Sequence, residues 1–166
     1  MRLVWITGLF FLLGFAAPVN ADVKIGYVNS SILLERAPQA EAATINLERE
    51  FADRERAIRQ AQQEIQELEN ALNRDAITMS ESERSQKEQE INRKVRELHR
   101  MQSNFRDDLN LRKNEELGRL QRLVLRAIRE VAQSQGYDLV LSEGVVYSAD
   151  RVDLTDEVLT QLQGMK

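Results

Sequence analysis

Apolar residues in the middle of the chain form a mirror pattern about position 78. Three pairs of large apolar residues lie at equal distances on either side of this point. The pairs are Phe51 with Phe105, Ile58 with Leu98, and Ile65 with Ile91. Within each half the apolar residues recur about every 3.5 positions, which is the repeat of a coiled-coil seam. Two helices that fold back on each other would bring the pairs together, so the pattern predicts an antiparallel helical hairpin.

Residues from both helices are predicted to line the seam of this hairpin. They are Leu47, Phe51, Ile58, Ile65, Leu68, Leu72, Ile91, Val95, Leu98, Phe105 and Leu109. Most residues between them are charged or polar and belong to the solvated face of a coiled coil. The sequence therefore predicts a projecting arm rather than a pocket.

Capping residues place the turn of the hairpin independently of the apolar pattern. Ser80, followed three residues later by Glu83, forms a capping box for the returning helix. Position 78 lies just before this box, inside the expected turn. We expect the first helix over residues 39–73 and the returning helix up to residue 134. Gly136 then suits the left-handed position that ends many helices.

The two ends of the chain predict short strands and short helices. An alternating segment at 23–28 indicates a first strand, and Asn29 and the serines after it cap a short helix over 32–37 that Pro38 interrupts. The other elements expected are strands over 137–141, 145–148 and 152–154, a hairpin loop over 142–144, and a last helix that Thr155 caps and that runs through Leu162.

The returning helix changes character in its last third. Apolar residues crowd it between 117 and 131, which indicates burial on most of its sides. Gly118 lies at the start of this stretch and costs the helix about 1 kcal/mol relative to alanine. A bend, a close contact or a tolerated glycine explains it equally well.

These elements predict an α+β, mostly helical fold. A long antiparallel coiled-coil hairpin, residues 39–111, projects from a small β-sheet or barrel body made of residues 22–38 and 112–166. Such short strands make a marginal sheet with open edges, so we expect copies of the chain to complete the body as a homo-oligomer. The residues assigned to this oligomerisation body are Val23, Ile25, Tyr27, Leu117, Leu120, Val124, Ile128, Leu139 and Leu141.

Residues 1–21 have the pattern of a secretory signal peptide. Arg2 supplies a positive start, residues 3–15 are uncharged and apolar, and small residues end at Ala21. An uncleaved membrane anchor is the alternative, but the apolar stretch is shorter than the roughly 20 residues that span a bilayer. We expect cleavage after Ala21 and export of the mature chain.

The composition excludes several classes of function. The chain has no cysteine, which removes disulfides and thiol chemistry, and its formal net charge is −4, or −5 once Arg2 is removed with the signal. An acidic balance argues against nucleic acid as a partner. No phosphate-binding loop or nucleophile elbow is present. The single histidine, His99, lies among charged residues of the returning helix. We expect no enzyme activity, no metal and no cofactor.

A few apolar residues outside the seam are candidates for weak contacts with a partner. Ile77 and Met79 lie in the turn, where they either touch a partner or close the end of the seam. Ile45, Met101 and Leu111 lie on the flanks of the predicted arm. Single apolar residues are common on protein surfaces, so this signal is weak.

The chain resembles the Skp/OmpH family of periplasmic chaperones over residues 22–166. The stretches that carry the resemblance are IGYVNSSILL at 25–34, RKNEELGRLQRLVLRAI at 112–128 and SQGYDLVLSEGVVYSADRVDLTDEVLTQL at 134–162. The resemblance implies a homotrimer whose strands form a small barrel and whose three arms enclose a cavity. It also implies ATP-independent capture of unfolded outer-membrane β-barrel proteins in the periplasm, before their insertion into the membrane.

The chain departs from the basic members of that family in its charge. It is acidic overall, and residues 73–94 around the turn hold five basic and five acidic residues. This balance argues against direct binding of anionic lipid or lipopolysaccharide, and we assign no lipopolysaccharide-site residues.

Two other functions are compatible with a helical hairpin. A structural or adaptor protein of the cell envelope would use the same hairpin to bind one specific folded partner. A peripheral membrane protein would need a wide apolar face and a basic polar face, and the predicted arm has a narrow seam with mixed charge.

Overall fold

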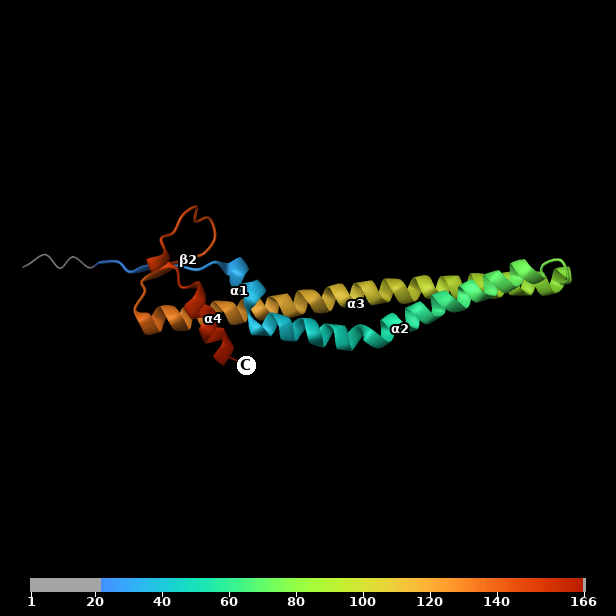
Figure 1. Ribbon diagram of the computed structural model, residues 1–166, viewed down its shortest axis with the longest axis horizontal. Helices are drawn as coiled ribbons and strands as arrows, with labels where there is room; N and C mark the ends of the chain where they lie inside the picture. The colour runs from blue at the N-terminus through green and yellow to red at the C-terminus, as the bar shows by residue number, and fades with distance from the viewer. Residues whose placement is uncertain (1–21, 166) are drawn as a thin grey trace, which may run out of the picture.

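A computed structural model of the protein describes residues 22–165. The expected signal segment, residues 1–21, lies outside the described residues. Two long helices dominate the molecule: α2 spans Pro38–Asp75 and α3 spans Glu81–Gln135. They run antiparallel, with their connection at the far end of the arm from the chain termini (Figure 1). The predicted hairpin is confirmed, and each predicted helix limit lies within two residues of the observed one.

Local capping chemistry fixes the limits of the long helices. Pro38 occupies the first turn of α2, where its missing N–H is not needed. At the start of α3, the Ser80 hydroxyl accepts from Glu83 N at 3.3 Å and the Glu83 carboxylate accepts from Ser80 N at 2.9 Å. Gly136 ends α3 at φ 70° and ψ 37°, the left-handed conformation that glycine adopts without steric cost. The predicted capping box and terminating glycine are both confirmed.

The body brings the two ends of the chain together. Strand β1, Ile25–Tyr27, pairs in parallel with β2, Leu139–Leu141, so that Ile25 lies opposite Leu139 and Tyr27 opposite Leu141. Helix α1 spans Ser30–Arg36, and the Asn29 side chain caps it by accepting from Ile32 N at 3.1 Å. A short 3-10 helix, η1, covers Asp150–Val152, and helix α4 covers Thr155–Gly164. All of these elements lie at one end of the long hairpin (Figure 1).

The hydrophobic core of the body lies where α1, α4 and the last third of α3 meet. Its largest side chains with almost no exposed surface are Leu33, Leu162, Val28 and Val158. The crowded apolar stretch predicts burial of α3 on most of its sides, but Leu117 and Leu125 are exposed, so α3 contributes only one buried face. The residues of this face are Leu120, Val124, Ala127 and Val131.

Three predictions for residues 142–154 are wrong. Residues 145–148 form no strand with any other described residue, and the hairpin predicted around Gly144 is a loop. Gly144 does turn the chain, at φ 77°, but residues 145–148 after the turn pair with no strand among residues 22–165. Residues 152–154 make one isolated parallel bridge, between Asp153 and Tyr27, instead of a fourth strand.

Thr155 does not cap α4 as predicted. It is the first residue of the helix, and the Asp153 carboxylate accepts from Thr155 N at 2.9 Å. The Thr155 hydroxyl instead accepts from Asn29 N at 2.9 Å. This bond joins the start of α4 to the start of α1, so a residue expected to act locally connects the two ends of the chain.

Candidate functional site

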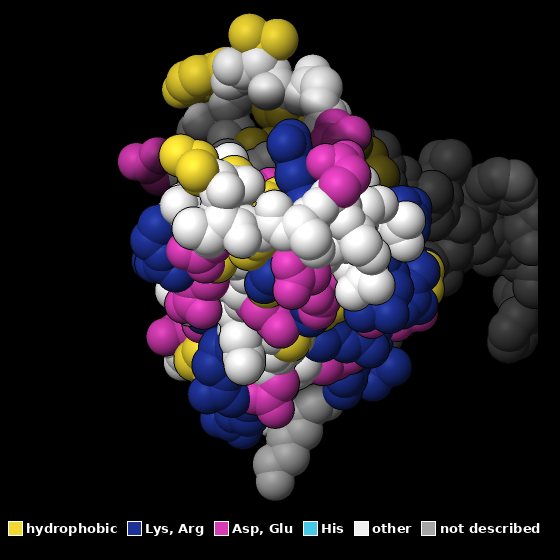
Figure 2. Space-filling view, turned by 90° about the vertical axis from the view of Figure 1, so that its right-hand side faces the viewer, with side chains coloured by type: hydrophobic (Ala, Val, Ile, Leu, Met, Phe, Trp, Pro, Cys, Tyr) yellow, Lys and Arg dark blue, Asp and Glu magenta, His cyan; other side chains and the backbone are white. Residues whose placement is uncertain are grey.

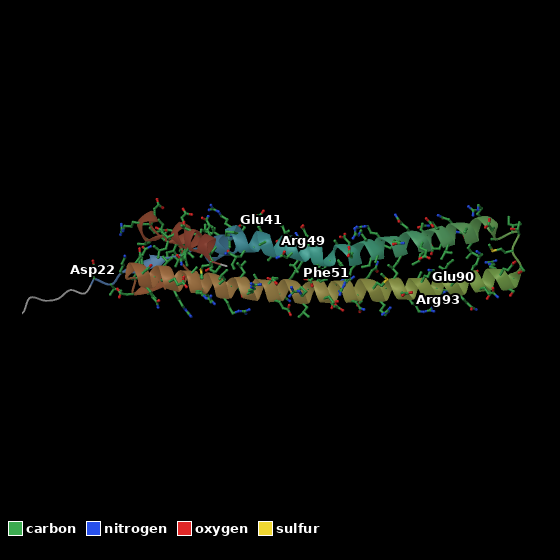
Figure 3. The ribbon with its side chains drawn as sticks, turned by 90° about the horizontal axis from the view of Figure 1, so that it is seen from below. Asp22, Glu41, Arg49, Phe51, Glu90 and Arg93 are labelled. Carbon is green, nitrogen blue, oxygen red and sulfur yellow. The ribbon has the colours of Figure 1, made fainter. Side chains whose placement is uncertain are left out.

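The seam between α2 and α3 is the framework of the arm. The Phe51 and Phe105 rings meet edge to face, with centroids 5.6 Å apart and planes at 86°. This geometry is favourable for two aromatic quadrupoles. Figure 3 shows Phe51 on the side of α2 that faces α3. The structure thus brings together the two phenylalanines that the mirror pattern pairs.

Burial along the seam is narrow. Phe51, Ile65 and Ile91 are buried. The remaining predicted seam residues are half-buried: Leu47, Ile58, Leu68, Leu72, Val95, Leu98, Phe105 and Leu109. A two-helix contact covers only one side of each helix, so most of the surface of the arm faces solvent.

Ion pairs between the two helices lie along the sides of the seam. Arg54 and Asp108 approach to 2.6 Å, and Lys94 and Glu64 to 2.7 Å. Arg112 contacts Glu50 at 3.3 Å. Exposed pairs of this kind contribute little to stability but disfavour other alignments of the two helices. Hydrogen bonding to Glu115 and the charge of Glu50 raise the pKa of Arg112 above its ordinary value.

The flanks and the tip of the arm combine both charges with isolated apolar residues. In the view onto the tip, Lys and Arg side chains are interspersed with Asp and Glu (Figure 2). Ile77, in the turn, is 97% exposed, and Ile45 and Leu111 are also exposed. Met79 is half-buried. Met101 lines a shallow groove beside the seam together with Ile58 and Phe105. The arm therefore presents scattered apolar contacts and no continuous apolar face.

The structure separates the residues predicted for the oligomerisation body into two groups. Leu120 and Val124 belong to the core of this chain, and Tyr27 and Ile128 are half-buried. The other predicted residues are exposed in the single chain: Val23, Ile25, Leu117, Leu139 and Leu141. Four of these five come from the strand region, which leaves apolar side chains and open strand edges at the surface.

Comparisons with known proteins connect this architecture with a family. Residues 24–162 match the family model described as outer membrane protein (OmpH-like). The chain belongs to this family. It is 31% identical over 157 residues to the chaperone protein Skp of Pectobacterium atrosepticum, covering 94% of this chain and 95% of that protein. It is 32% identical over 152 residues to the chaperone protein Skp of Photorhabdus luminescens, covering 91% and 92% of the two chains.

A solved structure shows that the fold is also shared. The crystal structure of an OmpH-like outer membrane chaperone from Caulobacter crescentus matches with a TM-score of 0.78. The match covers 98% of this chain and 92% of that chain, at 15% sequence identity. At that identity the likeness establishes the fold alone. It confirms the predicted fold class, a long helical hairpin on a small strand-containing body.

Skp/OmpH proteins are a family of chaperones and not of enzymes, in agreement with the sequence. His99 is exposed on α3. Residues 22–165 contain no group of three or more His, Cys, Asp or Glu side chains placed to hold a metal ion. Over the same residues, no helix is both long enough and apolar enough to cross a membrane.

Sequence reasoning missed several residues that connect the arm to the body. The Gln39 side chain, in the first turn of α2, donates to the carbonyls of Leu162 and Met165 at 2.6 and 2.8 Å. These bonds attach the end of α4 to the root of the arm.

The loop between β2 and η1 was also missed as a surface: Val146 and Tyr147 are almost fully exposed. Hydrophobic side chains stand out at the upper edge of Figure 2, where this loop projects.

Proposed function

We propose that the protein is an ATP-independent holdase chaperone. In this proposal it binds unfolded outer-membrane β-barrel proteins in the periplasm and prevents their aggregation before membrane insertion. The observation that carries the proposal is the surface of the arm, where single exposed apolar residues lie among charges of both signs. Such a surface makes weak, dispersed contacts, which suit clients without a fixed shape and avoid trapping them.

Membership of the OmpH-like family supports this proposal. The relatives described above are named chaperone proteins, and the solved structure is described as an outer membrane chaperone. Holding an unfolded chain requires no chemical step. A chaperone that binds the unfolded client lowers the concentration of free unfolded client, and so slows its aggregation. The energy for release then comes from folding of the client into the membrane.

We propose that the working form is a homotrimer. The strands are three residues long, and the sheet has only two of them within the described chain. A sheet of this size is marginal on its own. Covering Val23, Ile25, Leu139 and Leu141 with the same region of other copies removes apolar surface from water and protects the open edges. A stable monomer at micromolar concentration by light scattering would contradict this.

The decisive experiment is native mass spectrometry of the exported protein without nucleotide. It is mixed with a barrel protein freshly diluted from denaturant and, separately, with the same barrel protein already folded. A complex of three copies with one unfolded client and none with the folded protein is the expected result. A complex with the folded form alone would favour the adaptor function. The mass of the exported protein also tests the predicted start at Asp22.

Direct binding to lipid is not part of the proposal. The acidic net charge of the chain and the mixed charges at the tip provide no basic surface for anionic headgroups there. Nucleic acid is not proposed as a partner either, because the chain is acidic overall.

A further inference from the structure

Arginine is concentrated on α3 next to the root of the arm. Residues 117–129 contain four arginines and no acidic residue, in a chain that is acidic overall. Three of them, Arg119, Arg122 and Arg126, follow one another at intervals of three and four and so share one face of the helix. All three line a groove between α3 and the first turns of α2. We call it the arginine groove.

These arginines have no acidic partner among residues 22–165. No ion pair joins Arg119, Arg122 or Arg126 to a described carboxylate, and all three are exposed. Arg112, two turns before Arg119 on α3, differs because it contacts Glu50 and Glu116. Glu116 also lines the groove, but its carboxylate is held by Arg112 at 3.4 Å. The groove therefore has positive charge that the described chain does not neutralise.

The walls of the arginine groove leave room for a ligand with apolar groups. Helix α2 contributes Ala42 and Ala43, whose small side chains keep the space open. Helix α3 contributes Leu120 and Leu123, which pack in or against the core of the body. A ligand that carries both carboxylates and apolar side chains would match a groove lined by arginines and apolar residues.

The apolar part of the lining distinguishes a polypeptide from a simple anion. Leu120 and Leu123 lie beside the arginines in the same groove, so a ligand that carries apolar side chains next to its carboxylates can contact both. A free phosphate group would contact the guanidinium groups alone.

We propose that the arginine groove binds acidic segments of unfolded polypeptide clients. The proposal rests on the proposed chaperone function and adds a specific site to it. Guanidinium groups pair with carboxylates in a two-point geometry, which gives stronger contacts than the dispersed apolar residues of the arm. The root of the arm would then hold the acidic part of a client while its apolar parts contact the flanks.

Fluorescence anisotropy on the exported protein tests this. The probe is a labelled peptide in which aspartates and leucines are separated by serines, and its matched form has lysine in place of aspartate. The groove variant combines Arg119→Gln, Arg122→Gln and Arg126→Gln. The control variant combines Arg93→Gln, Arg96→Gln and Arg106→Gln, which removes the same charge from exposed α3 positions nearer the tip that also make no ion pair with a described carboxylate.

The expected result is tighter binding of the aspartate peptide than of the lysine peptide by the unaltered protein. The groove variant should bind the aspartate peptide about tenfold more weakly, and the control variant should change by less than about twofold. Added salt should weaken the binding by the unaltered protein. Equal losses in both variants, or no loss in the groove variant, would overturn the site.

Two further outcomes separate the groove from the chaperone function. If the unaltered protein captures an unfolded barrel protein but the groove variant binds the peptide normally, only the groove is wrong. If the unaltered protein binds neither the peptide nor the barrel protein, both proposals fall. In another outcome the peptide fails to bind, while vesicles that contain phosphatidylglycerol bind the unaltered protein and not the groove variant. That result would assign the site to lipid phosphate and overturn the proposal.

Discussion

One helix, α3, runs through both parts of the molecule, and its two parts are buried in different ways. In the arm it contacts only α2, and Ile91 is its one buried seam residue. In the body the same helix packs against both α1 and α4, and Leu120, Val124, Ala127 and Val131 are all buried. Free energy of folding should therefore be concentrated in the body. The arm can open or bend at lower cost, which suits a part of the molecule that must adapt to clients.

Substitution in the core of the body should have the largest effect. The Leu33 side chain, on α1, is completely buried in the core of the body. Leu33→Ala should therefore lower the free energy of unfolding by about 3 kcal/mol, through lost apolar burial and a residual cavity. Urea denaturation followed by circular dichroism measures it. Leu111→Ala, at an exposed position on the arm, is the control and should change stability by less than about 0.5 kcal/mol. Equal effects would contradict the contrast between body and arm.

Substitution of the aromatic pair should weaken the arm without unfolding the body. Phe51→Ala should cost about 2 kcal/mol, less than in a fully enclosed core because a two-helix seam leaves one side open to water. Hydrogen exchange should become faster in α2 and in the facing part of α3, and should change little around Val158. A double-mutant cycle with Phe105→Ala should give a coupling energy of about 1 kcal/mol. A coupling near zero would mean that the ring contact does not stabilise the arm.

Most of the arm could be predicted from the sequence because its determinants are local. The heptad spacing, the Ser80 and Glu83 capping box and Gly136 each act within a few residues, and together they fix two long helices and their turn. The same reasoning did not find the contacts of the body. The bond between Asn29 and Thr155 and the bonds from Gln39 to the end of α4 join residues more than a hundred positions apart.

The errors in the body have a common physical cause. Valine and tyrosine at 145–147 favour strands, but a strand also needs an edge to pair with, and composition does not specify that partner. The crowded apolar stretch of α3 predicted that Leu120 and Val124 are buried, but not which segments they pack with, and their core cluster includes residues of α1 and α4 in the same chain. An apolar helix face shows that something packs on it and does not show which segment does so. The predicted hairpin already placed α2 opposite α3, but the apolar pattern did not show which charged side chains beside the seam lack a described partner, so the arginine groove was missed.

Two glycines offer a pair of substitutions with opposite expected signs. At Gly26, in β1, a methyl group would lie 2.5 Å from Leu154 Cδ1, so Gly26→Ala should destabilise the body by about 1 to 2 kcal/mol. At Gly118, in α3, the nearest atom is the flexible end of Arg122 at 3.5 Å, so Gly118→Ala should stabilise the protein by about 0.5 to 1 kcal/mol. Thermal unfolding of both variants measures the two changes. A destabilising Gly118→Ala would show that this position needs a bend or a close contact with another copy.

The smallest effect concerns the tip of the arm and is a change of pKa. The Ser80 backbone N–H and hydroxyl both donate to the Glu83 carboxylate and lower its pKa below the ordinary value. Because the pKa is lower in the folded state, the stability that this contact contributes is present above the unfolded-state pKa. It is lost as pH falls through the folded-state pKa. Acidification should therefore loosen the start of α3 while the capping contacts of α1 persist, since Asn29 does not titrate.

Ser80→Ala removes the hydroxyl donor but keeps the backbone N–H, so the pKa of Glu83 should rise part of the way to its ordinary value. An NMR titration of the glutamate side chains measures this rise, and Glu88, whose only described partner is Arg84, provides an internal reference on the same helix. The start of α3 should also lose about 1 kcal/mol of local stability in this variant, because a serine cap is removed. An unchanged pKa of Glu83 would mean that the capping box is not populated in solution. The position at which α3 begins would then depend on the seam contacts alone.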